Sequence, residues 1–524
     1  MGQADRTVAL LERLAKSAAD PRPLLQVLTP GRVAVVLDTV IAGEPQAQLL
    51  FSFAVNLLAR LYPIVQSLEV VAPPTAITTR LPRWAGVTVD EHARRLLTAL
   101  NPPVRWTVVG SLQRGPDCAL VVGTAPAPAA ATVFVGSEGW LASASPVGPV
   151  SVGPGVNPIG AYAAGCLGVG EVCKRLLERH RELFEGVPII PIEWPLVFST
   201  FTYRTDRAGP NPALPDTVDL RRLTLVGVGA GGGALAFTLA SLPDLRGVLR
   251  LIEPDEVIDA NLNRYVWADA EDVVTQREKA KVAAALFDGF PNLVILADPK
   301  PYHDVASSLG PEDYRYVVAA VHSREARREL QLETPMVLWD AGATEHGEFF
   351  IWRMILGSME CMHCKHPPGQ GDPERDKAVQ LAQLLGLDVA TWLRKVRDNQ
   401  AFREEEVVVI AARAAAGGIS IELPMPGQRY DDWERLQCGK LRLPEVDEEI
   451  PFACAPVMAG VLLAGEVVKE HYFPDAVLDS YYWNTLLGRF MVRNRPYRRR
   501  PRPDCSFCWD DVYLAQYRRR WTDG

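Results

Sequence analysis

The chain has 524 residues, of which 48% are hydrophobic and 23% are charged, and its formal net charge is −8. This length exceeds one ordinary hydrophobic core, so we expect two or three domains. The acidic balance argues against a nucleic-acid binder, which would normally present a basic face. The N-terminus lacks the apolar core of a signal peptide, and the longest apolar run, 457–468, is too short to span a bilayer. We therefore expect a soluble, cytoplasmic protein with no membrane partner.

The first half, up to about residue 200, alternates strand-like and helical patterns. Apolar runs at 32–36, 68–71 and 119–122 predict strands, and the run that begins NPIGAYAAG predicts a long helix over 157–185. This alternation indicates an α/β layer structure. Because no GxGxxG sequence follows these early strands, we expect this half to lack a nucleotide loop.

A proline-rich linker at 188–215 leads into the second half, which opens with a βαβ pattern. An apolar run at 223–226 predicts a buried strand, 234–241 predicts a helix, and 249–252 predicts the next strand. The turn GVGAGGG lies between the first strand and the helix. This order is the context in which a glycine-rich turn is typical of nucleotide binding.

The turn contains Gly227, Gly229 and Gly232 at GxGxxG spacing. Glycines allow the backbone to turn tightly and to approach phosphates, whose charge is met by amides at the helix N-terminus. Glu253 ends the next strand, where an acidic side chain would hold ribose hydroxyls. Both an ATP-dependent enzyme and a dehydrogenase need these features. The glycine turn and Glu253 therefore do not distinguish between the two enzyme classes.

Three residues that follow favour ATP chemistry: Asn261, Arg264 and Lys279. When a carboxylate attacks the α-phosphate of ATP, negative charge grows there and on the departing pyrophosphate, and cations and amide donors must already be in place. A hydride-transfer enzyme has no comparable need. The alternative reading, a salt-bridged loop with a solvated lysine, leaves the order of the three features unexplained.

Two Cys-x-x-Cys pairs lie far apart in the chain, Cys361 with Cys364 and Cys505 with Cys508. Four thiolates in this arrangement suit a tetrahedral zinc ion, and a closed four-sulfur site is structural. Redox dithiols are the alternative. The zinc would tie the C-terminus back to the ATP-binding domain. The two histidines beside the first pair are expected to be bystanders.

The combined motifs VGVGAGGGALA, IEPDEVIDANLNRY, QREKAKV and LWDAGATEHG resemble the superfamily of ubiquitin-activating enzymes and the bacterial adenylyltransferases of thiamine and molybdopterin biosynthesis. The resemblance covers 223–367 and resumes over 451–508. It implies ATP and Mg²⁺ as cofactors, with zinc at the cysteine pairs. It further implies that the three glycines line the phosphate site, that Glu253 holds the ribose, that Asn261 and Arg264 contact phosphates, and that Lys279 stabilises the α-phosphate.

Two positions depart from the family pattern. His322 stands in VVAAVHSREARR where the family has a magnesium-binding aspartate, and imidazole is a poor ligand for an ion that prefers oxygen. We expect Asp255 or Asp340 to hold magnesium instead, unless the domain is impaired. Tyr265 replaces a glutamine of the family, which is a milder change.

The resemblance places a thioester-forming cysteine between the first zinc pair and the last helix, and two cysteines lie there. Cys438 is flanked by basic residues in WERLQCGKLRL, which lower a thiol pKa and favour Cys438 as the nucleophile. Cys454, in PFACAPVMAG, has the alternative role of an apolar anchor. The remaining cysteines, Cys118, Cys166 and Cys173, have core-like surroundings.

The segment 367–449 is polar and looks inserted, with predicted helices at 374–385 and 390–398 and a predicted strand at 407–411. We expect it to dock a carrier or a conjugating enzyme. A last amphipathic helix is predicted over 456–470.

The two halves share a sequence pattern. The run NPIGAYAAGCLGVGEVCKRLLE is similar to APVMAGVLLAGEVVKEHYF near the C-terminus. This similarity indicates a duplication in which the first copy lost its glycine loop. By the resemblance, the first copy would buttress the active one as a pseudo-dimer within one chain, and it would be a candidate to donate an arginine to ATP.

We therefore predict an inactive adenylation-like domain at 1–200, an active one at 201–366, an insertion at 367–449, and the C-terminal part of the active domain at 450–524. The predicted function is adenylation of the C-terminal glycine of a ubiquitin-like protein, then a cysteine thioester passed to a conjugating enzyme. This two-copy plan, with the chemistry in the second half, most resembles the bacterial ubiquitin-like conjugation operons associated with antiphage defence. A sulfur-carrier adenylyltransferase, a nicotinamide oxidoreductase and a catalytically impaired scaffold are the alternatives.

Overall fold

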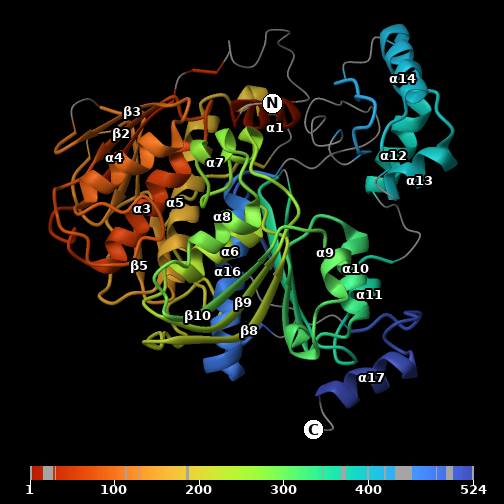
Figure 1. Cartoon of the computed structure of the whole chain (residues 1–524). Helices are drawn as coiled ribbons and strands as arrows, with labels where there is room; N and C mark the ends of the chain where they lie inside the picture. The colour runs from red at the N-terminus through yellow and green to blue at the C-terminus, as the bar shows by residue number, and fades with distance from the viewer. Residues whose placement is uncertain are drawn as a thin grey trace.

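The computed structural model describes residues 3–15, 28–29, 31–112, 115–127, 129–184, 188–344, 346–367, 373–397, 400–417, 421–430, 433, 451–478, 481–490 and 500–521. These residues build two seven-stranded mixed sheets with helices, as expected for an α/β chain (Figure 1). The first half of the chain forms one sheet, and the second half forms the other together with a segment that returns from the C-terminal end.

The first sheet has the strand order β3-β2-β1-β4-β5-β6-β7. Its strands are β1 (Arg32–Leu37), β2 (Ser67–Val71), β3 (Arg105–Val109), β4 (Cys118–Val122), β5 (Ala131–Glu138), β6 (Leu141–Ser145) and β7 (Leu196–Ser199). Its helical elements are α1 (Gln3–Leu14), α3 (Pro45–Ala59), α4 (Val89–Leu100), α5 (Pro158–Glu178) and the 3₁₀ turn η1 (Arg181–Phe184). The predicted strands are confirmed, and the predicted long helix ends earlier, with η1 following it.

The second sheet has the order β10-β9-β8-β11-β12-β13-β14. Its strands are β8 (Val218–Val226), β9 (Leu245–Ile252), β10 (Asn292–Asp298), β11 (Tyr316–Ala319), β12 (Val337–Ala343), β13 (Glu348–Met354) and β14 (Tyr481–Thr485). The helical elements are α6 (Ala230–Ala240), η2 (Asp259–Asn261), α7 (Ala270–Val274), α8 (Lys279–Ala285), α9 (Tyr302–Ala306), η3 (Pro311–Tyr314), α10 (Arg324–Leu332), α11 (Met362–Lys365), α16 (Cys454–Tyr472), η4 (Pro474–Ala476) and α17 (Asp511–Trp521).

The two sheets have the same topology. Adding seven to each strand number of the first sheet gives the order of the second. In each sheet the first five strands pair in parallel and the last two pair antiparallel. This match is consistent with two Rossmann-like copies and supports the duplication that the sequence indicates.

Helices of both halves share one core. Helix α3 packs on α5, α6 packs on α16, and α5 contacts both α6 and α16. The rings of Phe53 and Tyr162 stack with centroids 4.1 Å apart, and Phe237 lies within 6.2 Å of both. The hydroxyls of Tyr162 and Ser241 are hydrogen-bonded at 2.6 Å. A single cluster of buried apolar side chains therefore runs from the first half into the second.

The repeated Gly-Glu-Val-x-Lys run makes the same buried ion pair in each copy. Glu171 pairs with Lys174 in α5, and Glu466 pairs with Lys469 in α16. Each lysine also donates to a backbone carbonyl of the linker 188–215: Lys174 to that of Ile190 (2.9 Å) and Lys469 to that of Phe201 (3.0 Å). Each copy thus uses its pair to hold a connecting segment.

The described residues of the inserted segment form three helices with a core of their own. These are α12 (Pro373–Leu384), α13 (Val389–Arg397) and α14 (Glu404–Gly417), and Figure 1 shows them set apart from the two sheets. Four buried aromatic side chains centre this core: Trp392, Phe402, Tyr430 and Trp433.

The strand predicted at 407–411 is wrong, because these residues lie inside α14. Three glutamates in the first turn favour the helix dipole, and the alanine-rich second part has high helix propensity. A strand would also need a partner for its backbone groups, whereas a helix satisfies its own.

The helix predicted over 456–470 is confirmed and extends two residues further at each end, but it is not amphipathic. It is α16, it begins at Cys454, and it is buried on all sides through Lys469 rather than amphipathic. It is also followed by another helix, α17, whose residues pack near the second cysteine pair. Helices α5 and α6 and strands β8, β12 and β13 pack around α16.

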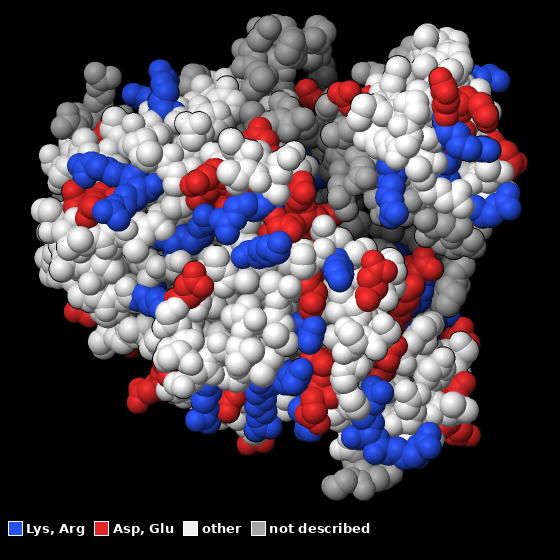
Figure 2. Space-filling model, viewed as in Figure 1, with Lys and Arg blue, Asp and Glu red and all other residues white. Residues whose placement is uncertain are grey.

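The molecular surface mixes charges of both signs. On the face shown in Figure 2, lysine and arginine side chains alternate with aspartate and glutamate, in keeping with the small net charge of −8. Within the described part of the chain, no helix combines the length and the apolar character needed to cross a bilayer.

We expect Glu466→Met to lower the free energy of unfolding by about 3–5 kcal/mol, because it leaves the buried ammonium of Lys469 without its carboxylate. Urea unfolding followed by circular dichroism would measure the change. Asp206→Asn is the control, since it removes an exposed ion pair with Arg204 and should leave the midpoint unchanged. Equal shifts in both variants would contradict this account of the buried pair.

Candidate nucleotide and metal sites

The glycine loop turns between the end of β8 and the start of α6. Gly227 has a φ of +92°, a conformation that favours glycine, and a Cβ there would lie 2.5 Å from the carbonyl oxygen of Ala320. A Cβ on Gly232 would lie 2.0 Å from the carbonyl oxygen of Gly227. Gly229 caps α6, so the first amides of this helix face the turn. The predicted strand-turn-helix context is therefore confirmed.

Glu253 ties the second strand to the glycine loop. Its carboxylate follows β9 and accepts the backbone N–H of Val228 at 2.7 Å and that of Asp255 at 3.1 Å. The side chain is buried, and the ammonium of Lys279 lies 4.0 Å away. The acid predicted for ribose binding thus lies directly beside the loop predicted for phosphate binding.

Lys279 begins α8 and points into the same site. Its Nζ donates to the carboxylate of Asp255 at 2.8 Å and lies 5.5 Å from the ring centroid of Tyr265. Burial disfavours the charged form, but Tyr265, Glu253 and Asp255 outweigh it and raise the pKa of Lys279 above its usual value. The site therefore holds a permanent cation at neutral pH.

Asn261 and Arg264 lie on the segment between β9 and α7. The Asn261 side chain accepts the N–H of Ile258 at 3.2 Å. Arg264 donates to the carbonyl of Ala260 (3.1 Å) and to the side chain of Asn263 (2.7 Å). Both predicted phosphate contacts are almost fully buried, so in this structure they also organise their own loop.

Two aromatic residues join this segment to the glycine loop. Tyr265 stacks on Trp267 with centroids 5.0 Å apart. The hydroxyl of Tyr265 lies 3.7 Å from where a Cβ on Gly229 would stand, and a Cβ on Gly233 would lie 1.7 Å from Nε1 of Trp267. Gly233 is therefore required for Trp267 to pack on α6. Sequence reasoning noted Tyr265 only as a departure and missed Trp267.

Asp340 forms its ion pairs with residues other than those around the glycine loop. It is fully buried in β12, and its two oxygens form ion pairs with Arg327 (2.9 Å) and Lys365 (2.8 Å). Burial alone would raise the pKa of the carboxyl, but the two cations lower it. Arg327 also donates to the carbonyl of His322. Asp255, whose side chain is one-third exposed, is the more open of the two carboxylates predicted to hold magnesium.

Of the two candidate nucleophiles, the structure describes only Cys454. Cys454 is the first residue of α16 and is fully buried, and burial raises the pKa of its thiol well above the usual value. A thiol in this setting is a poor nucleophile. Cys438 lies outside the described residues, so its role stays a prediction. The core-like positions of Cys118, Cys166 and Cys173 are confirmed, because all three are fully buried.

The two Cys-x-x-Cys pairs meet in one cluster. Cys361 lies 3.7 Å from Cys364 and 3.6 Å from Cys505, and Cys364 lies 3.6 Å from Cys508, between sulfur atoms. All four sulfurs lie within 4.8 Å of one another and are buried. A tetrahedral zinc ion with sulfurs ~2.3 Å away needs them about 3.8 Å apart. The cluster therefore fits a metal such as zinc, as predicted.

The histidines beside the first pair have other contacts. The ring of His363 is hydrogen-bonded to the side chain of Gln331 at 2.8 Å and stacks on Phe507 at 5.0 Å. Burial lowers the pKa of His366 to about 3. Among the described residues, neither joins the four sulfurs as a candidate metal ligand.

The first copy has an acidic group where the second has its glycine loop. Asp38 follows β1, as Gly227 follows β8, and its carboxylate accepts the amide of Val40 and both the amide and hydroxyl of Thr124. Burial would raise the pKa of Asp38, but these hydrogen bonds lower it, so the group stays charged. Glu44 also caps α3. Two negative charges at this turn disfavour a phosphate.

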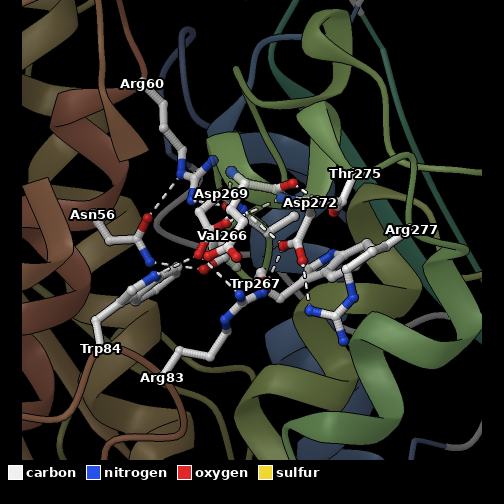
Figure 3. A network of polar contacts seen from close by, with 12 residues as sticks. Asn56, Arg60, Arg83, Trp84, Val266, Trp267, Asp269, Asp272, Thr275 and Arg277 are labelled. Atoms are coloured by element: carbon white, nitrogen blue, oxygen red, sulfur yellow. Dashed lines mark hydrogen bonds and ion pairs between the residues drawn. The ribbon is translucent and has the colours of Figure 1, made fainter. Parts of the chain in front are cut away.

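Residues of the first half contact the site segment directly, and sequence reasoning missed them. Asn56 and Arg60, at the end of α3, and Arg83, before α4, donate to carbonyl oxygens of 262–268 (Figure 3). One signal was present in the sequence. The run ITTRLPRW at 77–84 matches IDANLNRY at 258–265 in its isoleucine, leucine, arginine and terminal aromatic.

Two comparisons with known proteins bear on these sites. Residues 34–178 match the family model described as Prokaryotic E2 family C. The chain is also 25% identical over 498 residues to the uncharacterized protein y4jF of Sinorhizobium fredii (strain NBRC 101917 / NGR234), an alignment that covers 93% of this chain and 91% of the relative. The family match points to ubiquitin-like conjugation, and it falls on the first copy rather than on the copy with the glycine loop.

We expect the purified protein to contain about one zinc ion per chain, measured by inductively coupled plasma mass spectrometry. Cys505→Ser should lose the metal and lower the melting temperature, because the ion joins α11 to the segment before α17. Cys173→Ala, which changes a buried thiol outside the cluster, should keep the metal. Zinc retained in Cys505→Ser, or absent from the wild type, would contradict the proposed metal site.

Proposed function

We propose that this protein activates the C-terminal carboxylate of a ubiquitin-like protein by adenylation with ATP. One observation carries the proposal. A glycine loop, the acid Glu253 and the permanent cation of Lys279 converge at the carboxyl ends of β8 and β9, beside the loop that bears Arg264. This edge of an open parallel sheet is where such folds bind ligands.

The chemistry explains why these groups lie together. The carrier's carboxylate attacks the α-phosphorus of ATP, the bond to the β-phosphate oxygen breaks, and pyrophosphate leaves with the electron pair. Preorganised cations stabilise the charge that grows on the phosphates. Lys279 and Arg264 would supply them. Magnesium would neutralise pyrophosphate when bound, and Asp255, the more exposed of the two candidate carboxylates, would hold it.

The match to an E2 family raises a second function, conjugating-enzyme transfer by the first copy. That reaction needs an accessible nucleophilic thiol. The matched range contains three cysteines, Cys118, Cys166 and Cys173, and all are fully buried. Burial raises the pKa of each, to about 12 for Cys118. The burial of these thiols argues for a supporting role of the first copy.

The first copy has a further candidate role at the nucleotide. Helix α1 packs against η2, which carries Asn261. Arg6 on α1 is nearly buried at 8% exposure. It is therefore our candidate for the arginine that the first half donates to ATP.

A thioester step would follow adenylation. We assign it to Cys438, because its basic neighbours favour a thiolate and because Cys454 is buried. The thiolate would attack the acyl-adenylate, release AMP and hold the carrier for a conjugating enzyme, in a pathway of the antiphage type.

ATP–pyrophosphate exchange tests adenylation. The assay would use a ubiquitin-like carrier that ends in glycine, taken from the same gene cluster, with magnesium supplied. Lys279→Ala should lower the exchange rate by about 10²-fold, the scale expected for loss of one preorganised charge at the transition state. Lys281→Ala, in the same helix but exposed and paired with Glu278, should leave it unchanged. Absence of carrier-dependent exchange in the wild type would overturn adenylation and favour the scaffold role.

Non-reducing electrophoresis tests the thioester. The wild type, incubated with ATP and carrier, should give an adduct that dithiothreitol cleaves. Cys438→Ala should lose the adduct and keep pyrophosphate exchange, while Cys454→Ala should keep both, with lower thermal stability. Normal exchange with no adduct in any protein would instead indicate a sulfur-carrier adenylyltransferase.

A further inference from the structure

The segment 262–268 of the second copy is held from outside by side chains of the first. Arg60 donates through one terminal nitrogen to the carbonyl of Leu262 (2.7 Å) and through the other to the carbonyl of Ala268 (2.8 Å). Asn56 donates to the carbonyl of Val266 (2.7 Å) and accepts Nε of Arg60 (2.7 Å). Figure 3 shows both side chains reaching from α3 to this segment.

A second contact fixes the end of the same segment. Arg83 donates to the carbonyl of Trp267 (2.9 Å) and forms ion pairs with Asp269 (2.8 Å) and Asp272 (2.7 Å). The Nε1 group of Trp84 also donates to Asp269. Asp269 caps α7, so the clamp reaches the helix that follows the segment.

The carbonyls that Arg60 contacts bracket the functional part of the segment. Between Leu262 and Ala268 lie Arg264, Tyr265 and Trp267. Tyr265 reaches toward Gly229, and Trp267 packs on Gly233. Two aromatic rings therefore lie between the segment that Arg60 contacts and the glycine loop.

Stability alone is a weak reason to keep this arrangement. Arg60 is fully buried, and its hydrogen-bond partners are two carbonyls and one amide oxygen. Removing a guanidinium from water is costly, and a well-packed apolar side chain often serves stability equally well. What the planar guanidinium adds is a fixed spacing between the two carbonyls that it joins.

We propose that Arg60 and Asn56 of the first copy are positioning residues for the nucleotide site of the second copy. They hold the segment 262–268 in place against the glycine loop, so that Arg264 is in position before ATP and the carrier arrive. This proposal rests on the proposed adenylation activity. It gives the first copy a defined task in the reaction of the second copy. The corresponding turn of the first copy carries Asp38 in place of a glycine loop.

Three variants test the proposal by pyrophosphate exchange. Arg60→Met removes the donors and keeps a similar volume, and its kcat should fall by about 10²-fold, the scale of a small misplacement of reacting groups. Arg60→Lys keeps one charged donor and should recover part of this loss. Arg80→Met is the matched control: Arg80 also crosses between copies, to the carbonyls of Ala240 and Asp288, but does not touch 262–268. It should keep wild-type kcat.

Hydrogen exchange of the amides at 261–268 gives a readout that does not depend on activity. Exchange of these amides should be faster in Arg60→Met than in the wild type and unchanged in Arg80→Met. If the wild type shows no pyrophosphate exchange, adenylation fails, and hydrogen exchange still decides whether Arg60 positions the segment. Equal effects of Arg60→Met and Arg80→Met in either assay, or full kcat in Arg60→Met, would overturn the proposal.

Discussion

The packing of α16 on α6 is the constraint on which the rest of the molecule depends. A Cβ on Gly460 would lie 2.1 Å from the carbonyl oxygen of Gly231, so the two helices touch backbone to backbone. Because α6 begins at the glycine loop, this contact fixes the loop against a helix from the far end of the chain. Helix α5 lies against the same pair and brings the first copy with it. The glycine loop, the first copy and the C-terminal return therefore share one core, and none of them is placed independently.

Within this shared core, two copies of one topology differ at the turn that follows their first strand. The second copy has Gly227 at its turn, where a backbone can approach a phosphate. The first has Asp38, whose charge repels one. The first copy keeps a degenerate version of the second copy's motif at 77–84, and Arg83 within it binds acids of the partner copy rather than a phosphate. In the first copy this motif thus contacts the second copy.

The sequence was informative where the signal is local. Strand runs, the glycine spacing and the cysteine pairs depend on neighbours a few residues away, and the structure bears them out. The strand predicted at 407–411 was wrong because its β-branched residues favour a strand locally, whereas the helix-forming residues around them determine the observed helix. The contacts of Arg60 could not have been predicted from the sequence. They join Arg60 to backbone carbonyls more than 200 residues away, and every residue type has the same backbone carbonyl. The burial of Cys454 likewise depends on α5, which no local pattern reports.

Under the proposed function, fusion of the two copies would explain why only the second carries a glycine loop. In a symmetric dimer each chain must keep both a working site and the surface that supports its partner's site. A single chain removes that requirement, because the two copies meet at high effective concentration whatever their separate affinity. Selection on the first copy would then act on its contacts with the second. This account fits a half that keeps all seven strands and its buried Glu171–Lys174 pair, and that carries an acid where phosphate would bind.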